Sequence, residues 1–247
     1  TKDQIIKICD RNFIGCDQLI FIESSKSTDA NLKFFNSDGG ESGACGNGTR
    51  CIAKLISNET KNETVILTTL NGDLKSQILE NNIVTTEIGN AKIEWNEIPL
   101  SKKSDTKNLN IKIIDVNDKE YFGGTAVNVG NPHVVFFVNK IENFDIEKIG
   151  PQVENYNIFP EKCNVTIAKI VDKNLIKVKV WERGAGLTKA CGTAACATAF
   201  AGKLNNLTEN RTDIEFQTGK LSIFIDDKDS IHMKGPVSEI KKIEIKL

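Results

Sequence analysis

Apolar and polar positions alternate along this chain with two different periods. Runs with a period near two predict strands, and stretches with a period near 3.6 predict helices. In the first half one expected helix is followed by three expected strands, and the second half repeats that order. The expected elements are a helix over 48–57 and strands over 65–69, 74–79 and 83–88 in the first half, and a helix from 192 to about 203 and strands over 214–217, 221–225 and 231–234 in the second.

A cysteine precedes each of these two helices in nearly the same local sequence. Cys45 lies in Ala-Cys-Gly-Asn-Gly, and Cys191 lies in Ala-Cys-Gly-Thr-Ala. Polar residues in otherwise apolar strands also recur at equal distances, 27 and nine residues before each cysteine. The matched positions are Gln18 with Asn164 and Asn36 with Glu182. This self-similarity predicts two half-sites related by a pseudo-twofold axis.

The two halves differ at their beginnings. The second half opens with a strand over 111–115, a loop, and an apolar strand over 126–138 that holds Gly-Asn-Pro-His at 130–133. The first half starts directly with residues 3–10, which correspond to the helix expected over 144–155. We therefore infer that one strand and its loop are missing from the first half, and that a neighbouring strand has an unpaired edge.

These patterns predict an α+β fold made of two pseudo-symmetric domains. Each domain is expected to be a curled, mostly antiparallel sheet around one central helix, with an active site in the cleft between the domains. The first domain is expected to cover 1–114 and the second 115–235. A last strand over 240–247, within the segment 236–247, is expected to return to the first domain.

Composition and charge exclude several classes of protein. The formal net charge of the 247 residues is -1, which gives no reason to expect a nucleic-acid partner. No apolar run approaches the roughly 18 residues of a membrane span, and we find no secretory leader. The seven cysteines are an odd number without a C-x-x-C pair, so neither a disulfide framework nor a zinc site is expected. A cytoplasmic location fits, and the sequence leaves a homodimer open.

Two matched thiols suit the removal of a proton from one face of a carbon and its return to the opposite face. A free cysteine has a pKa near about 8.5, which a helix N-terminus can lower, so Cys45 and Cys191 are well placed as thiolate bases. The unpaired amides of a first helical turn can also bind a carboxylate as it takes on enolate character. The candidates for that role are Gly46, Asn47, Gly192 and Thr193.

Four separated motifs resemble those of the diaminopimelate epimerase family. They are Phe-Asn-Ser-Asp-Gly at 35–39, Cys-Gly-Asn-Gly-Thr-Arg-Cys at 45–51, Gly-Asn-Pro-His at 130–133, and Glu-Arg-Gly-Ala-Gly at 182–186 followed by Ala-Cys-Gly-Thr at 190–193. The resemblance covers essentially the whole chain. It implies the family's fold, epimerisation of LL-2,6-diaminopimelate to meso-diaminopimelate without pyridoxal phosphate or any other cofactor, no metal, and a place in lysine and peptidoglycan precursor biosynthesis.

The resemblance also implies roles for individual residues. Cys45 and Cys191 act as base and acid and exchange these roles with the direction of the reaction, while His133 and Glu182 adjust the protonation of the two thiols. Amide side chains of the family bind the distal end of the substrate. Arg183 can pair with a carboxylate and Glu182 can accept from an ammonium group. The implied substrate-binding residues are Gln18, Asn36, Gly46, Asn47, Asn131, Asn164, Glu182, Arg183, Gly192 and Thr193.

The chain departs from the family pattern in a few places. Ala194 stands where the family usually has Gly, Leu187 stands at a common Glu position, and the family's Gly-Asn-Asp-Phe motif with its substrate-binding Asn has no counterpart here. Other cysteines, the two tryptophans and His232 are expected to serve packing only. They are Cys9, Cys16, Cys51, Cys163, Cys196, Trp95, Trp181 and His232.

Two alternatives to the epimerase stay open at this level. One is a proline racemase or a related amino-acid racemase, which also uses paired cysteines, although the motifs at 131–133 and 182–184 argue against it. The other is a non-catalytic relative, or a thiol redox protein in which Cys45 and Cys191 form a reversible disulfide. Only a racemase or epimerase would place solvent deuterium at a substrate Cα.

Overall fold

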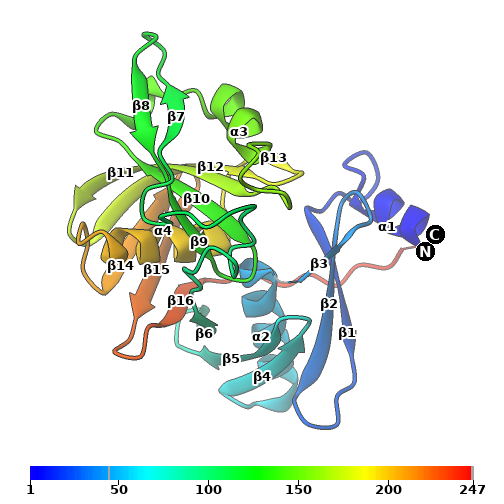
Figure 1. Ribbon diagram of the computed structural model, residues 1–247. Helices are drawn as coiled ribbons and strands as arrows, with labels where there is room; N and C mark the ends of the chain where they lie inside the picture. The colour runs from blue at the N-terminus through cyan, green and yellow to red at the C-terminus, as the bar shows by residue number, and fades with distance from the viewer. Residues whose placement is uncertain (44, 246–247) are drawn as a thin grey trace. The chain divides into compact units, whose positions relative to one another are not determined.

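The computed structural model describes residues 1–43 and 45–245, and these residues form two compact units (Figure 1). Unit 1 comprises Thr1–Glu87 with Pro236–Leu247, and unit 2 comprises Ile88–Gly235. Both units combine helices with sheets, so the α+β class expected from the sequence is confirmed. Ala44, the first residue of one duplicated turn, lies outside the described residues.

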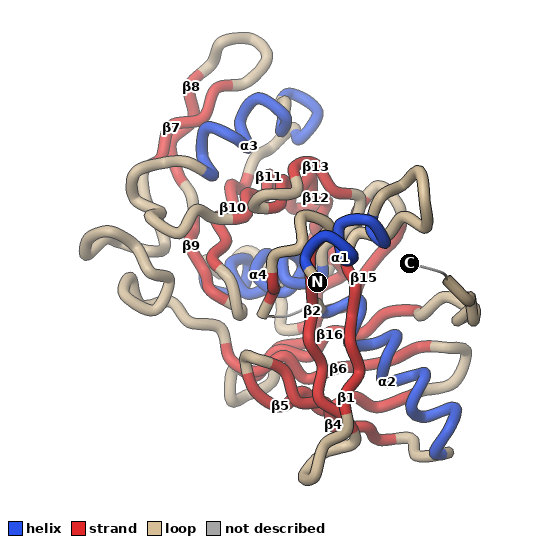
Figure 2. The backbone as a smooth tube through the Cα atoms, turned by 90° about the vertical axis from the view of Figure 1, so that its right-hand side faces the viewer, coloured by secondary structure: helices blue, strands red, loops and turns tan. Residues whose placement is uncertain are grey.

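Unit 1 has one sheet with the strand order β1-β2-β4-β5-β6, in which only the β2–β4 pair is parallel. Figure 2 shows β1 and β2 as two long neighbouring strands, and the short β3 pairs with β2. The elements are α1 (Lys2–Cys9), β1 (Gln18–Glu23), β2 (Ala30–Asn36), β3 (Glu41–Ser42), α2 (Gly46–Thr60), β4 (Thr64–Thr69), β5 (Gly72–Ile78) and β6 (Ile83–Asn90), of which β6 runs past the limit of the unit.

The core of unit 1 lies between α2 and its sheet. Helix α2 contacts β4 and β5 (Figure 1), because Ala53 and Ile56 recur at helical spacing on its buried face. Facing them are Phe34 and Leu67, which are at most 1% exposed. Truncating such a side chain to alanine typically costs about 2–5 kcal/mol of stability. The position of α2 relative to the sheet is therefore firmly determined within the unit.

Unit 2 has a larger sheet with the order β16-β15-β14-β12-β11-β10-β9, to which β13 is added at β12, and a separate β7–β8 hairpin. The β10–β11 and β12–β14 pairs are parallel, and the other pairs are antiparallel. The elements are β7 (Ile111–Ile114), β8 (Glu120–Gly123), β9 (Thr125–Asn128), β10 (Pro132–Phe137), the 3-10 helix η1 (Ile141–Asn143), α3 (Ile146–Glu154), β11 (Asn164–Asp172), β12 (Leu175–Glu182), β13 (Gly186–Thr188), α4 (Gly192–Leu204), β14 (Arg211–Phe216), β15 (Gly219–Ile225) and β16 (Ser230–Pro236).

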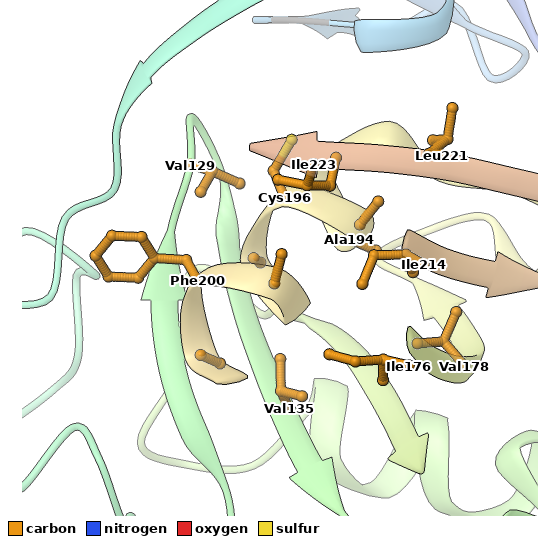
Figure 3. Close-up of a cluster of buried hydrophobic side chains, with 14 of the residues drawn as sticks. Val129, Val135, Ile176, Val178, Ala194, Cys196, Phe200, Ile214, Leu221 and Ile223 are labelled. Carbon is orange, nitrogen blue, oxygen red and sulfur yellow. The ribbon is translucent and has the colours of Figure 1, made fainter. Parts of the chain in front are cut away.

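Helix α4 is buried almost all round within unit 2. Its side chains are mostly small, and Figure 3 shows Ala194 and Cys196 among the large residues Ile214 and Ile223 of the surrounding strands. Burial on all sides explains why the sequence of α4 shows no polar face. The small side chains let the surrounding strands approach the helix closely. A second cluster of buried side chains in unit 2 includes Ile149 of α3.

The two units repeat one topology around their cysteines. The order β1-β2-β3-α2-β4-β5-β6 in unit 1 matches β11-β12-β13-α4-β14-β15-β16 in unit 2. The strand registers match as well, because Phe34 pairs with Ser42 and Val180 pairs with Thr188, at identical distances from the respective cysteines. The pseudo-symmetric architecture predicted from the duplicated turns is thus present in the residue pairing.

Three details differ from the expectations. Residues 88–114 belong to unit 2, because Ile93 packs on the α4 core and Ile98 and Leu100 are buried beside α3, so the expected boundary at 114 lies inside that unit. The expected single strand over 126–138 is an antiparallel pair, β9 and β10. Residues 240–245 form no strand, and the last two residues of that expected strand lie outside the described part of the chain.

The units also differ at the strand that precedes β2 or β12. In unit 2 that strand, β11, pairs with the parallel β10, which pairs in turn with β9. In unit 1 the equivalent strand, β1, is the terminal strand, and the described residues of this unit include no counterpart of β9 and β10. One edge of β1 is therefore open in the described chain.

Candidate functional site

Cys45 is the N-cap residue of α2. Its backbone is extended, with φ -144° and ψ 101°, and its sulfur accepts a hydrogen bond from the Gly48 amide at 3.2 Å. Thr49 closes the turn, since its amide and its hydroxyl both donate to the Cys45 carbonyl, at 2.8 and 2.9 Å. A thiol thus takes the capping position usually held by Ser, Thr or Asp, where the helix dipole favours negative charge.

The first turn of α2 is held from within by a buried arginine. Arg50 is 4% exposed, and its guanidinium donates to Asn47 Oδ1 at 2.9 Å and to the Gly46 carbonyl at 3.4 Å. Both acceptors belong to residues that the sequence marks as a carboxylate cradle. The sequence motifs assign no role to Arg50, although its spacing of three from Asn47 in a helix is a signal for this contact.

Gln18 and Asn36 form the second part of the unit 1 arrangement. They are cross-strand partners at the ends of β1 and β2, and Gln18 Nε2 donates to Asn36 Oδ1 at 2.8 Å. The backbone N–H of Asn36 donates to the Gly40 carbonyl at 2.8 Å, which closes the turn after β2. The structure therefore brings together the two polar residues that the equal spacings single out in this half.

Cys191 is the N-cap residue of α4 in unit 2, with the same extended backbone, φ -141° and ψ 116°. It is only 6% exposed, and its sulfur lies 3.4 Å from Thr193 Oγ1. Burial raises the pKa of the Cys191 thiol well above its usual range, and the nearby charge of Glu182 raises it further, while Thr193 and the Ala194 amide act in the opposite sense. This cysteine is therefore a protonated thiol at neutral pH.

Asn164 and Glu182 correspond to Gln18 and Asn36. The antiparallel register of β11 and β12, with Val165 opposite Trp181, places Asn164 opposite Glu182. Asn164 is 2% exposed, accepts from the Arg183 amide at 3.0 Å and donates to the Pro132 carbonyl at 2.9 Å. The acceptor and the donor of this buried side-chain amide thus both have partners, and the side chain fixes the start of the turn that follows β12.

His133 opens β10 beside these residues. It is the parallel-register partner of Asn164, is fully buried, and its Nε2 lies 2.8 Å from Asn131 Oδ1. Burial, with a smaller contribution from the charge of Arg183, lowers the pKa of His133 to about 3, so the ring is neutral at pH 7. Its Nδ1 is buried without a hydrogen-bond partner in the described structure.

Glu154 is another buried charged residue to which the sequence patterns assign no role. It ends α3, is 6% exposed, and accepts from Trp181 Nε1 at 2.7 Å and from the Gly184 amide at 3.3 Å. A single acidic residue at a helix end gives no signal in one sequence, because most such residues are exposed.

Two other kinds of function, metal binding and membrane insertion, lack support among the described residues. No group of three or more His, Cys, Asp or Glu side chains in residues 1–43 and 45–245 is arranged to hold a metal ion. Over the same residues, every helix is too short or too polar to cross a membrane.

Comparison with known proteins identifies one family over most of the chain. The family model described as Diaminopimelate epimerase matches residues 1–94 and 125–240. A protein named diaminopimelate epimerase from Pelagibacter ubique (strain HTCC1062) is 65% identical over 246 residues, which are 100% of this chain and 90% of that protein. A protein of the same name from Elusimicrobium minutum (strain Pei191) is 40% identical over 238 residues, or 95% of this chain and 86% of its own length.

Solved structures resemble the chain in fold at low sequence identity. A predicted epimerase from Pseudomonas aeruginosa has a TM-score of 0.69 at 11% identity, covering 99% of this chain and 87% of its own. A probable proline racemase from Agrobacterium radiobacter K84, solved with bound carbonate, has a TM-score of 0.68 at 8% identity, covering 99% and 81%. At these identities the likeness concerns the fold alone.

Proposed function

The chain belongs to the diaminopimelate epimerase family, and on this basis we propose that it interconverts LL-2,6-diaminopimelate and meso-diaminopimelate by a two-cysteine mechanism. The observation that carries the mechanism is the duplicated capping position. Cys45 and Cys191 occupy the same place in two units of matched strand register, each at the N-terminus of a helix. A repeated thiol of this kind is expected where a proton is exchanged on both faces of one carbon.

The contacts of the two thiols support a role for each of them in one direction of the reaction. The Cys45 sulfur accepts a hydrogen bond from the Gly48 amide, and in that direction it removes the Cα proton. Cys191 is buried and holds its proton, so it donates that proton to the opposite face of the carbanion. At the end of the turnover Cys45 is a thiol and Cys191 a thiolate, which is the starting state for the reverse direction.

The carbanion needs stabilisation because the Cα hydrogen of an amino acid is a very weak acid. Charge that develops on the α-carboxylate is stabilised by amides already oriented toward it. The first turns of α2 and α4 supply these amides through Gly46, Asn47, Gly192 and Thr193, and Arg50 orients Asn47. The remaining polar residues, proposed to bind the distal amino-acid end, are Gln18, Asn36, Asn131, Asn164, Glu182 and Arg183.

His133 and Glu182 are proposed to adjust the protonation of this site. Glu182 acts on Cys191 directly, since its charge favours the protonated thiol. His133 is neutral at pH 7 and adds no positive charge that would favour a Cys191 thiolate. The odd number of cysteines, seven, is the reason to propose a reducing cytoplasm as the compartment of a lysine-biosynthetic enzyme.

Incubation of the protein with LL-diaminopimelate in deuterated water tests this function. We expect deuterium at one Cα and formation of the meso isomer, detected by mass spectrometry and NMR. Cys45→Ser and Cys191→Ser should each lower epimerisation by at least about 10³-fold, because a serine hydroxyl is a far weaker acid and base at neutral pH. A Cys163→Ser variant, altered at a buried cysteine outside the two caps, is the matched control.

Two outcomes would contradict the proposal. Epimerisation that survives the loss of both capping thiols would exclude the two-cysteine mechanism. Exchange with proline or hydroxyproline but not with diaminopimelate would identify a different racemase on the same fold.

A further inference from the structure

Glu154 connects two residues that flank the turn carrying Glu182 and Arg183. Its Oε2 accepts from the Trp181 indole at 2.7 Å, and its Oε1 accepts from the Gly184 amide at 3.3 Å. Trp181 is the residue before Glu182, and Gly184 is the residue after Arg183. One buried carboxylate thus holds both ends of a four-residue segment whose middle two residues belong to the proposed site.

The surroundings of Trp181 show that this contact has a defined geometry. A Cβ on Gly150 of α3 would lie 2.3 Å from Trp181 Cγ, so only glycine lets the helix approach the ring this closely. A Cβ on Gly186 would lie 3.5 Å from Trp181 Cη2, which is an ordinary contact distance. The close approach of α3 at Gly150 brings the end of the helix to the ring, where the indole nitrogen reaches Glu154.

The two acceptor atoms explain why this residue is a glutamate. A carboxylate can accept from both donors at once, and Lys162, whose Nζ lies 3.7 Å from Oε1, adds a compensating charge. A glutamine in the same position would keep one acceptor and turn an NH2 group toward the second donor. Replacing Glu154 by Gln therefore breaks one of the two contacts with little change in volume.

Unit 1 has no such arrangement at the matching positions. The residue equivalent to Trp181, ten positions before the cysteine, is Phe35, whose side chain has no N–H to donate. The last residue of α1, which corresponds to α3, is Cys9. Among the described residues, the double contact of Glu154, which we call the clamp, therefore occurs in the unit whose turn carries Glu182 and Arg183. In that unit the charge of Glu182 acts on Cys191.

We propose that Glu154 is a positioning residue of the epimerase, which holds the turn so that Glu182 faces Cys191 and Arg183 is presented to the substrate. This inference rests on the proposed function for the role of Arg183. Its structural part, the control of Glu182 and Cys191 by Glu154, can be measured without substrate.

The test compares Glu154→Gln with Glu147→Gln, an exposed glutamate on the same helix. For Glu154→Gln we expect a loss of about 10- to 100-fold in kcat/KM for diaminopimelate, since misplacement of a binding group by about 1 Å costs this much. The loss should include an increase in KM, and Glu147→Gln should keep the wild-type values. Circular dichroism and the thermal midpoint confirm that both variants fold.

Two further measurements do not depend on turnover. The indole resonance of Trp181 in a ¹H–¹⁵N spectrum, distinguished from that of Trp95 by a Trp95→Phe variant, should move upfield in Glu154→Gln. Alkylation of Cys191 by iodoacetamide at pH 8, followed by peptide mass spectrometry, should become about threefold faster or more, because a displaced Glu182 charge no longer opposes the thiolate. If Glu154→Gln does not fold, Trp181→Phe removes the indole donor of the same contact. Its effect is then measured by kcat/KM and by the rate of Cys191 alkylation.

The outcomes separate this inference from the proposed function. A wild-type protein that never places deuterium in diaminopimelate refutes the function, while the resonance and the alkylation rate still decide on the clamp. Wild-type kcat/KM, an unmoved indole resonance and unchanged Cys191 alkylation in folded Glu154→Gln would overturn the clamp. A shifted resonance with faster alkylation supports it.

Discussion

Ile20 fills the space beside Gly48. A Cβ built on Gly48 would lie 2.4 Å from Ile20 Cδ1 and 3.1 Å from Cys45 Sγ, so a side chain at this position must move the isoleucine, the thiol or both. The Gly48 amide also donates to that sulfur at 3.2 Å. The glycine in the first turn of α2 thus sets the position of the thiol as well as the width of the cradle.

The first prediction follows from this contact. Gly48→Ala should lower kcat/KM by about 10-fold because it displaces the Cys45 sulfur. The free energy of unfolding should change little, since alanine favours the helix over glycine by about 1 kcal/mol and offsets the crowding. Removing Cδ1 in Gly48→Ala with Ile20→Val should recover part of the activity. Gly123→Ala, where an added Cβ meets nothing within 4 Å, is the control.

Unit 2 solves the same packing problem with different residues. The residues at the positions of Ile20 and Gly48, counted from the cysteine, are Thr166 and Ala194, and both are at most 1% exposed. A shorter side chain on β11 thus accompanies the extra methyl on α4. We expect this shorter side chain to make room for Ala194 at the position where the family pattern has glycine.

The second prediction tests that compensation. Thr166→Ile should crowd Ala194 and cost about 1–3 kcal/mol of stability, which is typical of overpacking. Thr166→Ile combined with Ala194→Gly should recover much of it, and the interaction can be measured by a double-mutant cycle in urea. Thr166→Val, which keeps the volume, is the control. Purely additive effects of the two substitutions would show that these positions do not touch.

Much of the architecture around the cysteines could be predicted from the sequence. Gln18 begins one strand and Asn36 ends the antiparallel strand beside it, so the two residues lie opposite each other and form a hydrogen bond. Their distances from Cys45 along the chain indicated this pair because the same distances recur before Cys191. Asn164 and Glu182 follow the same rule. Pattern and spacing suffice where contacts are local or repeated, because strand pairing after a tight turn leaves few choices of register.

Other features depend on contacts that leave no local signal. Val129 is buried within the turn between β9 and β10. The apolar pattern over 126–138 therefore continues through the turn and does not reveal that two strands are present. Glu154 looks like any acidic residue at a helix end, and only the packing of Gly150 on Trp181 brings it into the interior. The roles of the site residues remain predictions, which activity and reactivity measurements can decide.

The third prediction concerns the reactivity of Cys191. Burial, reinforced by the charge of Glu182, raises the pKa of this thiol, so its alkylation by iodoacetamide should be slow at pH 7 and increase only at alkaline pH. Glu182→Gln removes the charge and should move the pH profile of Cys191 alkylation to lower pH. Peptide mass spectrometry separates Cys191 from the six other cysteines. An identical profile in Glu182→Gln and in the exposed control Glu161→Gln would refute the electrostatic contact.

The fourth prediction concerns acid stability. His133 has its pKa lowered from 6.5 to about 3 in the folded protein, chiefly by burial. Below about pH 6.5 the unfolded chain takes up a proton that the folded protein does not, so the free energy of unfolding falls by about 1.4 kcal/mol per pH unit from this group alone. The stabilising contribution is complete above pH 6.5 and is lost as the pH falls toward 3.

Urea unfolding of wild type and His133→Gln at several pH values measures this contribution. Carboxylates titrate equally in both proteins, so the difference between the two curves isolates the histidine. Between pH 7 and pH 5 the wild type should lose about 2 kcal/mol more stability than the variant. A His232→Gln variant measures the share of the other histidine in the chain. Parallel curves for wild type and His133→Gln would mean that the ring is accessible to protons in the folded protein, against its complete burial beside Asn131.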